Sequence, residues 1–130
     1  MGSNTYKAAK NKIKINEGQL RIVMTRSPKK YQPDELPGQL EFKNETPKSL
    51  VKQFKDKGHS KLLVLGGGMI NSIFIKFGLV NEIYLTVEPL IFAKGKSLVN
   101  EAEFKVKLKL VSFEKMNKQG TLLLKYKVIT

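Results

Sequence analysis

Three consecutive glycines, Gly66, Gly67 and Gly68, stand between an apolar run at 62–65 and a segment with helical apolar spacing. Glycine has no Cβ, so a run of glycines lets the backbone turn tightly and lets another chain or a ligand come close. The first N–H groups of a helix have no partner within the helix and carry partial positive charge, so a glycine turn at a helix start can also hold a phosphate. These residues alone leave both interpretations open.

Few other residues of the chain could do chemistry. The sequence contains no cysteine and one histidine, His59, which excludes disulfides and thiolate nucleophiles and leaves little for a zinc site. Glu82 and Glu88 lie near the ends of an expected strand and could touch a substrate, although a carboxylate there is equally consistent with a surface group. We therefore expect no metal site and assign no general base.

The composition is that of one folded domain. With 130 residues, 41% of them hydrophobic, the chain can bury a real core. No apolar run approaches the length of a membrane span, and the opening MGSNTYKAAKNK lacks the hydrophobic stretch of a secretory signal. We expect a cytoplasmic protein without a membrane partner.

The net charge of +13 raises nucleic acid as a partner, because basic side chains clustered on one face attract it. Here the lysines are spread along the chain, and only Arg21 and Arg26 are arginines. Recognition of bases and phosphates favours the forked guanidinium of arginine, so a diffuse lysine surplus indicates a solvated surface. We do not expect nucleic acid as a partner.

The first half of the sequence predicts alternating strands and a helix. The β-branched run at 19–25 predicts a strand, and a brief extended piece follows at 40–42. Thr46 is a good N-cap and Pro47 suits the first position of a helix, which Gly58 is expected to end.

The second half predicts a β-α-β unit followed by a hairpin. Residues 61–65 and 83–92 are almost continuously apolar, as strands covered on both faces are, and 69–77 has helical spacing. Residues 105–113 and 122–128 flank a turn of sequence NKQG and predict an antiparallel hairpin. The predicted fold class is α/β, in a single domain.

The stretch GGGMINSIFIKFGLVNEIYLTVEPLIFAKGKSL resembles the dihydrofolate reductase-like superfamily, in the branch of the riboflavin-biosynthesis reductase domain. In that branch a glycine-rich turn and helix lead into an LVDE segment, a strand ending in proline and a G-x-G turn. Here LVNE at 79–82, Pro89 and the AKG turn take these places, with Asn81 for the usual aspartate and Ala93 for the usual glycine. MGSNTY is similar to the family's MGRxTY, and VMTRSP to its strand ending in threonine or serine, arginine and serine. The similarity covers residues 1–128.

The resemblance implies a three-layer fold of dihydrofolate reductase type, with a mostly parallel sheet and a C-terminal antiparallel hairpin. It also implies NADPH along the carboxyl ends of the strands, where open α/β sheets generally bind ligands. The pyrophosphate would meet the two helix starts, and the Thr-Arg-Ser segment would meet the 2′-phosphate. The residues so assigned are Gly66, Gly67, Gly68, Met69 and Ile70; Gly2, Ser3, Asn4 and Thr5; and Thr25, Arg26 and Ser27. A cis peptide bond between Gly66 and Gly67 is implied as well.

Members of this family have a strand and a helix before the part that this sequence matches. Those elements supply a central strand of the sheet and much of the substrate pocket. We therefore expect residues 1–130 to be an N-terminally incomplete domain, whose sheet is completed by upstream residues or by a partner. Alone, the chain is expected to be aggregation-prone and not to turn over substrate.

The resemblance implies a homodimeric, NADPH-dependent reductase of a ribosylaminopyrimidine or pterin-like substrate. The 5-amino-6-(5-phosphoribosylamino)uracil reductase of riboflavin biosynthesis is the first interpretation. One alternative is a dihydrofolate reductase, which the riboflavin-type C-terminal part disfavours. Another is a truncated, non-catalytic nucleotide-binding domain. Hydride transfer can depend mainly on positioning and on the chemistry of the cofactor, so no catalytic residue is assigned.

Overall fold

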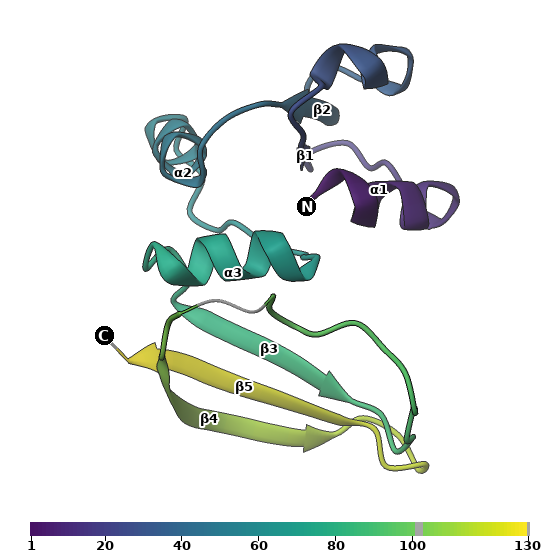
Figure 1. Cartoon of the computed structure of the whole chain (residues 1–130), viewed down its shortest axis with the longest axis vertical. Helices are drawn as coiled ribbons and strands as arrows, with labels where there is room; N and C mark the ends of the chain where they lie inside the picture. Colours follow the sequence, from purple (N-terminus) through teal and green to yellow (C-terminus); the bar gives the residue numbers. More distant parts are fainter. Residues whose placement is uncertain (101–102, 130) are drawn as a thin grey trace.

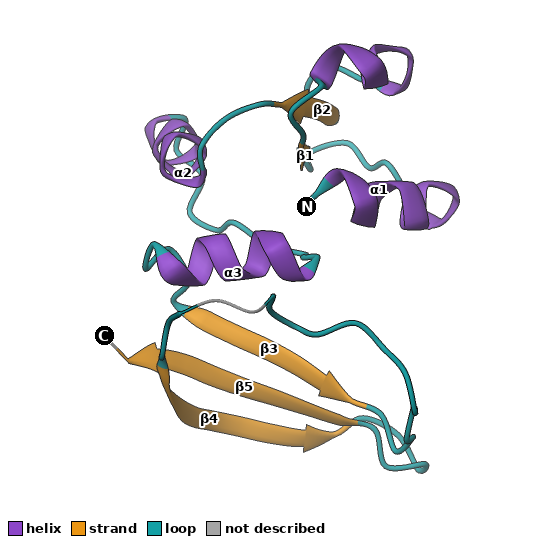
Figure 2. Cartoon of the chain, viewed as in Figure 1, coloured by secondary structure: helices purple, strands orange, loops and turns teal. Residues whose placement is uncertain are grey.

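The computed structural model describes residues 1–100 and 103–129. Its helices and strands are shown in Figure 2 and follow in the order α1 (Ser3–Ala9), the 3-10 helix η1 (Lys10–Lys12), β1 (Arg21–Met24), the 3-10 helix η2 (Pro28–Asp34), β2 (Leu40–Lys43), α2 (Pro47–Asp56), α3 (Gly68–Lys76), β3 (Glu82–Val87), β4 (Lys107–Lys115) and β5 (Leu122–Ile129). Within the described residues no helix is long and apolar enough to span a membrane.

The described strands form two separate sheets. β1 and β2 pair in parallel, with Val23 opposite Phe42. β3, β5 and β4 form an antiparallel sheet in that order, with β5 in the middle. Figure 1 shows α3 between the two sheets. The predicted α/β class is confirmed, and among the labelled strands β1 and β2 are the pair that runs in parallel.

The core lies on the two faces of the parallel pair. Val23 is fully buried and packs on one face in a cluster with Tyr6, Tyr31, Leu40 and Phe42. The rings of this cluster interlock, since Tyr31 stacks on Phe42 at 4.9 Å and Tyr6 meets Phe42 edge-on at 5.1 Å.

Ile22, the neighbour of Val23 along β1, faces the other way and packs against Leu50 and Phe54 of α2. Successive side chains of a strand point to opposite faces, so β1 joins helix α1 on one side to helix α2 on the other. This places the carboxyl end of β1 between two layers of helix.

Helix α2 begins and ends as predicted. The Thr46 hydroxyl accepts a hydrogen bond from the Ser49 N–H (3.2 Å), and Pro47 takes the first helical position. Gly58 has a φ of +82°, in the left-handed region that glycine adopts without strain, and stops the helix.

The predicted C-terminal hairpin is also confirmed. β4 and β5 pair antiparallel, and the Asn117 side-chain oxygen accepts from the N–H groups of Gly120 (3.0 Å) and Thr121 (3.1 Å) to close the turn. The register shifts between Leu110 and Ser112, so β4 carries a bulge.

The strand predicted at 61–65 forms no ladder with another described strand, and this expectation is wrong as stated. Leu62, Leu63 and Leu65 are 41%, 64% and 59% exposed, so the predicted burial on both faces is absent too. An apolar run is typical of a strand inside a sheet. To form a ladder, such a strand also needs a hydrogen-bonded neighbour about 4.8 Å away. No described strand lies along this segment.

The predicted β-α-β unit is therefore corrected. β3 pairs antiparallel with β5, not with residues 61–65. β3 also ends at Val87, short of the predicted end at 92. Pro89 has no N–H to give to a ladder, and Ile91 beyond it is fully exposed.

Candidate functional site

Three segments that are distant in sequence meet at one edge of the parallel sheet. The Met24 N–H donates to the Met1 carbonyl (2.8 Å), and the Gly2 N–H donates to the Gly66 carbonyl (3.0 Å). Gly2 and Met24 also form a parallel bridge. Met1 and Gly2 thus lie as a short strand between β1 and the glycine turn, and Thr25 follows β1 at the same edge. The predicted cofactor residues stand on these three adjacent segments.

The glycine turn uses the backbone freedom of its first residue. Gly66 is buried and has a φ of +81°, which residues with a Cβ rarely adopt. The peptide bond between Gly66 and Gly67 is cis, as the family resemblance implies.

Helix α3 begins with backbone donors that have no acceptor within the helix. Gly67 is its N-cap residue and contributes no side chain, and the first helical hydrogen bond runs from the Asn71 N–H to the Gly67 carbonyl (3.0 Å). The N–H groups of Gly68, Met69 and Ile70 precede that bond, so they have no acceptor within the helix. The first turn of α3 contains no acidic side chain, and its partial positive charge is available to an anion.

Close packing explains two glycines of the site sterically. A Cβ on Gly2 would lie 3.0 Å from Ile70 Cγ1, and a Cβ on Gly67 would lie 3.1 Å from Thr5 Oγ1. The starts of α1 and α3 therefore approach each other so closely that a side chain at either glycine would have to displace its neighbour by a few tenths of an ångström. The steric and the chemical interpretations of the glycines do not exclude each other, because the tight packing brings two helix starts to one place.

A loop after β3 closes over the start of α3, which sequence reasoning missed. The Asn100 N–H donates to Ser72 Oγ (2.8 Å), the Ser72 hydroxyl donates to the Gly68 carbonyl (2.8 Å), and Asn71 Nδ2 donates to the Leu98 carbonyl (2.8 Å). A signal existed in the sequence: Asn71 and buried Ser72 are polar positions inside the otherwise apolar helix GMINSIFIK. Their partners could not be found from local patterns.

The segment after β1 forms a polar turn. The Thr25 N–H donates to the Lys43 carbonyl (3.0 Å), and the Thr25 hydroxyl accepts from the Ser27 N–H (3.2 Å). Between them Arg26 is exposed, and its guanidinium makes no hydrogen bond or ion pair with the part of the chain that the structure describes. The turn leaves a guanidinium and two hydroxyl groups able to meet an anion beside the helix starts.

Glu82 and Glu88, the two carboxylates named from the sequence, lie at opposite ends of β3. Glu82 accepts a hydrogen bond from the Tyr84 hydroxyl (3.1 Å), which raises the pKa of that tyrosine. Glu88 accepts from the Thr121 hydroxyl (2.7 Å). Both carboxylates are therefore hydrogen-bonded to residues in or next to the antiparallel sheet, and their contact with a substrate stays a prediction.

Several solved structures share the dihydrofolate reductase-like α/β fold of this chain. A protein from Shewanella sp. PV-4 named for riboflavin biosynthesis superposes with a TM-score of 0.79 at 18% identity, over 100% of this chain and 72% of its own. A deaminase and 5-amino-6-(5-phosphoribosylamino)uracil reductase from Thermotoga maritima gives 0.70 at 15% identity, over 98% and 44%. A pyrimidine reductase-like protein from Corynebacterium diphtheriae gives 0.65 at 18% identity, over 84% and 50%.

The family itself follows from the sequence. Residues 5–122 match the RibD C-terminal domain family, and the chain belongs to that family. The resemblance seen in the sequence is thereby confirmed. No curated protein sequence matches the chain significantly. The chain spans half or less of the Thermotoga and Corynebacterium proteins, so the activities in their names do not transfer to it directly.

Proposed function

We propose that the chain is an NADPH-dependent reductase domain of riboflavin biosynthesis, with 5-amino-6-(5-phosphoribosylamino)uracil as its substrate. The observation that carries the proposal is the meeting of two helix starts and the Arg26 turn at the carboxyl edge of the parallel pair. Family membership and the names of two structural neighbours support the reaction class.

The donors at this edge fit a phosphorylated dinucleotide. The N–H groups of Gly68, Met69 and Ile70 and the start of α1 are suited to a pyrophosphate, since they combine unpaired donors with the positive end of a helix. Arg26 is suited to an additional phosphate, because a guanidinium binds phosphate through charge-assisted and often bidentate hydrogen bonds.

The protein's own contribution is binding and positioning. When bound, NADPH supplies the hydride. Gly2 and Gly67 let the two helix starts meet, and the loop at 97–100 holds the start of α3 through Ser72. Preorganised donors of this kind lose little freedom when the ligand binds, which favours affinity.

An assay of NADPH oxidation tests the proposed reaction. We expect residues 1–130 alone to bind NADPH without oxidising it. A version of the chain that is extended upstream, so that its sheet is complete, is expected to oxidise NADPH when the ribosylaminopyrimidine is added. Dihydrofolate serves as the second substrate in parallel reactions. Oxidation of NADPH with dihydrofolate but not with the ribosylaminopyrimidine would identify dihydrofolate as the substrate in place of the proposed one. A failure of both forms of the chain to bind NADPH would overturn the proposal.

A further inference from the structure

The Gly68 carbonyl, in the first turn of α3, accepts hydrogen bonds from a side chain and from a distant loop. The Ser72 hydroxyl donates to it (2.8 Å). The Asn100 N–H is shared, since it donates to Ser72 Oγ at 2.8 Å and to the Gly68 carbonyl at 3.3 Å. A carbonyl oxygen has two lone pairs and can accept from more than one donor. The loop at 97–100 therefore holds the first turn of α3 at this oxygen.

One more hydrogen bond and the third glycine keep the loop close to the helix. Asn71 Nδ2 donates to the Leu98 carbonyl (2.8 Å). A Cβ on Gly68 would lie 3.0 Å from the Ser97 carbonyl oxygen, so the space that a side chain would need is taken by the loop. Ser72 is buried, and the hydrogen bonds of its hydroxyl are therefore made mainly within the protein.

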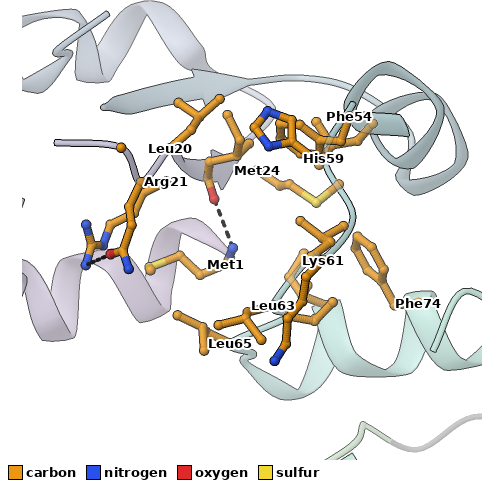
Figure 3. A pocket seen from close by; sticks show the side chains of 17 residues that line it. Met1, Leu20, Arg21, Met24, Phe54, His59, Lys61, Leu63, Leu65 and Phe74 are labelled. Carbon is orange, nitrogen blue, oxygen red and sulfur yellow. Dashed lines mark hydrogen bonds between the residues drawn. The ribbon is translucent and has the colours of Figure 1, made fainter. Parts of the chain in front are cut away.

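The other side of α3 is held by apolar contacts. Ile70 and Phe74 lie one helical turn apart and line an apolar pocket together with Phe54 and Leu63, and Figure 3 shows Phe74 at this pocket. Ser72 is two residues away from both Ile70 and Phe74, which is about 200° around the helix axis. The pocket and the loop therefore hold α3 from different sides, and only the loop contact acts on the Gly68 carbonyl.

This carbonyl shares a peptide with one donor of the proposed phosphate site. The Gly68 carbonyl and the Met69 N–H belong to the same peptide, whose atoms lie in one plane. The peptide is trans, so its oxygen and its hydrogen point in opposite directions. Hydrogen bonds that hold the oxygen thus fix the direction in which the Met69 N–H leaves the helix start. They also polarise the peptide, which makes the N–H a stronger donor.

We propose that Ser72 is a positioning residue for the bound nucleotide, and that docking of the loop at 97–100 on Ser72 and nucleotide binding at the start of α3 stabilise each other. The inference rests on the proposed function, because it takes a phosphate of the nucleotide as the acceptor of the Met69 N–H. Ser72 acts through the peptide between Gly68 and Met69. Because coupling is reciprocal, a loop that raises the affinity for the nucleotide is itself held more firmly when the nucleotide is bound.

The first test measures NADPH affinity by calorimetric titration of the unmodified protein, Ser72→Ala and Thr46→Ala. Thr46→Ala is the matched control, because it also removes a hydroxyl that bonds a helix backbone, here the Ser49 N–H of α2 (3.2 Å). We expect Ser72→Ala to weaken NADPH binding about fivefold, the effect of one lost hydrogen bond, and Thr46→Ala to leave it unchanged. Equal weakening in the two variants would show a general effect of lost stability and would overturn the inference.

The second test needs no substitution and measures hydrogen exchange of the unmodified protein with and without saturating NADPH. The Asn100 amide docks on Ser72, whereas the Thr121 amide donates to Asn117 Oδ1 (3.1 Å) in the β4–β5 turn and serves as the reference. We expect NADPH to slow exchange at Asn100 by about fivefold or more, and exchange at Thr121 much less. Unchanged exchange at Asn100, or equal slowing at both amides, would overturn the coupling.

The two proposals fail in different ways in these tests. If the unmodified protein does not bind NADPH, the proposed function is overturned and the inference falls with it. If the unmodified protein binds NADPH and Ser72→Ala binds it equally well, the role of Ser72 is overturned and the proposed function is retained.

Discussion

At the scale of single residues, the glycines of the site are required for two reasons that act together. Gly66 supplies a positive φ, whereas Gly2 and Gly67 allow two helix starts to approach. The same approach gathers the unpaired N–H groups at which a phosphate is expected. Sequence reasoning located Gly66 and Gly67 because a glycine triplet before a helical pattern is visible locally, whereas Gly2 was assigned only through the family resemblance. It could not locate the loop at 97–100, which reaches the site through tertiary contacts.

Gly68 tests the contact between that loop and α3. A Cβ at Gly68 would lie 2.5 Å from Asn100 Oδ1 and 3.0 Å from the Ser97 carbonyl oxygen, so Gly68→Ala must displace the loop. We expect the free energy of unfolding to fall by about 1–3 kcal/mol, the usual effect of overpacking, in urea denaturation. Gly95→Ala is the control, because a Cβ there meets nothing within 4 Å. Equal losses in both variants would contradict the described contact.

Asp34 makes a prediction about pH. Its carboxylate accepts hydrogen bonds from Lys10 Nζ (2.7 Å) and the Tyr6 hydroxyl (3.1 Å), and the bond from Lys10 is the main cause that lowers its pKa below the ordinary 3.8. A carboxyl group with a lowered folded-state pKa stabilises the fold above its unfolded-state value, and this stabilisation disappears as the pH falls through the folded-state value.

We therefore expect Asp34→Asn to lower the melting temperature at neutral pH, and the difference from the unmodified protein to vanish in acid below the folded-state pKa. Asp56→Asn is the control, because its pair with Lys52 is exposed on both sides and should contribute little. A difference for Asp34→Asn that persists unchanged in strong acid would contradict the assignment.

At the scale of helices and strands, sequence patterns predicted the elements whose structure depends on residues close together in the chain. Caps and apolar spacing predicted α2, and alternation with a turn sequence predicted the β4–β5 hairpin. The segment at 61–65 has an equally clear strand pattern but forms no ladder, because pairing depends on a distant neighbour that the pattern itself does not specify. The edge at which Met1, β1 and the glycine turn meet was predicted only through the family resemblance, for the same reason.

The N-cap of α2 is the direct test of such a local signal. Thr46→Ala removes the acceptor of the Ser49 N–H, and we expect the free energy of unfolding to fall by about 1 kcal/mol. Thr46→Ser keeps a hydroxyl in the same place and should retain most of the stability. An equal loss in the free energy of unfolding for Thr46→Ser and Thr46→Ala would contradict the described N-cap hydrogen bond.

At the scale of the whole molecule, the two described sheets are each small and expose much apolar surface. Leu63, Phe92 and Phe113 are 64%, 75% and 71% exposed, which is unusual for large apolar side chains. The predicted completion of the sheet and the predicted homodimer would each cover part of this surface. The predicted incompleteness of the domain and its homodimeric state both stay predictions.

Association in solution follows from that exposure. We expect sedimentation velocity to show species heavier than the 14.7 kDa chain, with a share that grows with protein concentration. A monodisperse 14.7 kDa species at all concentrations would show that the exposed apolar surface needs no partner.

The proposed NADPH site is tested most directly by calorimetric titration of NADPH and NADH into the unmodified protein, Arg26→Ala and Lys29→Ala. Lys29→Ala is the matched control, because it removes one exposed cation from the same turn region. We expect Arg26→Ala to weaken NADPH binding by about tenfold or more, the effect of one charge-assisted contact, and hardly to change NADH binding. We expect little effect of Lys29→Ala on either nucleotide. Equal weakening of NADPH and NADH by Arg26→Ala, or no binding of NADPH by the unmodified protein, would contradict the proposed NADPH site.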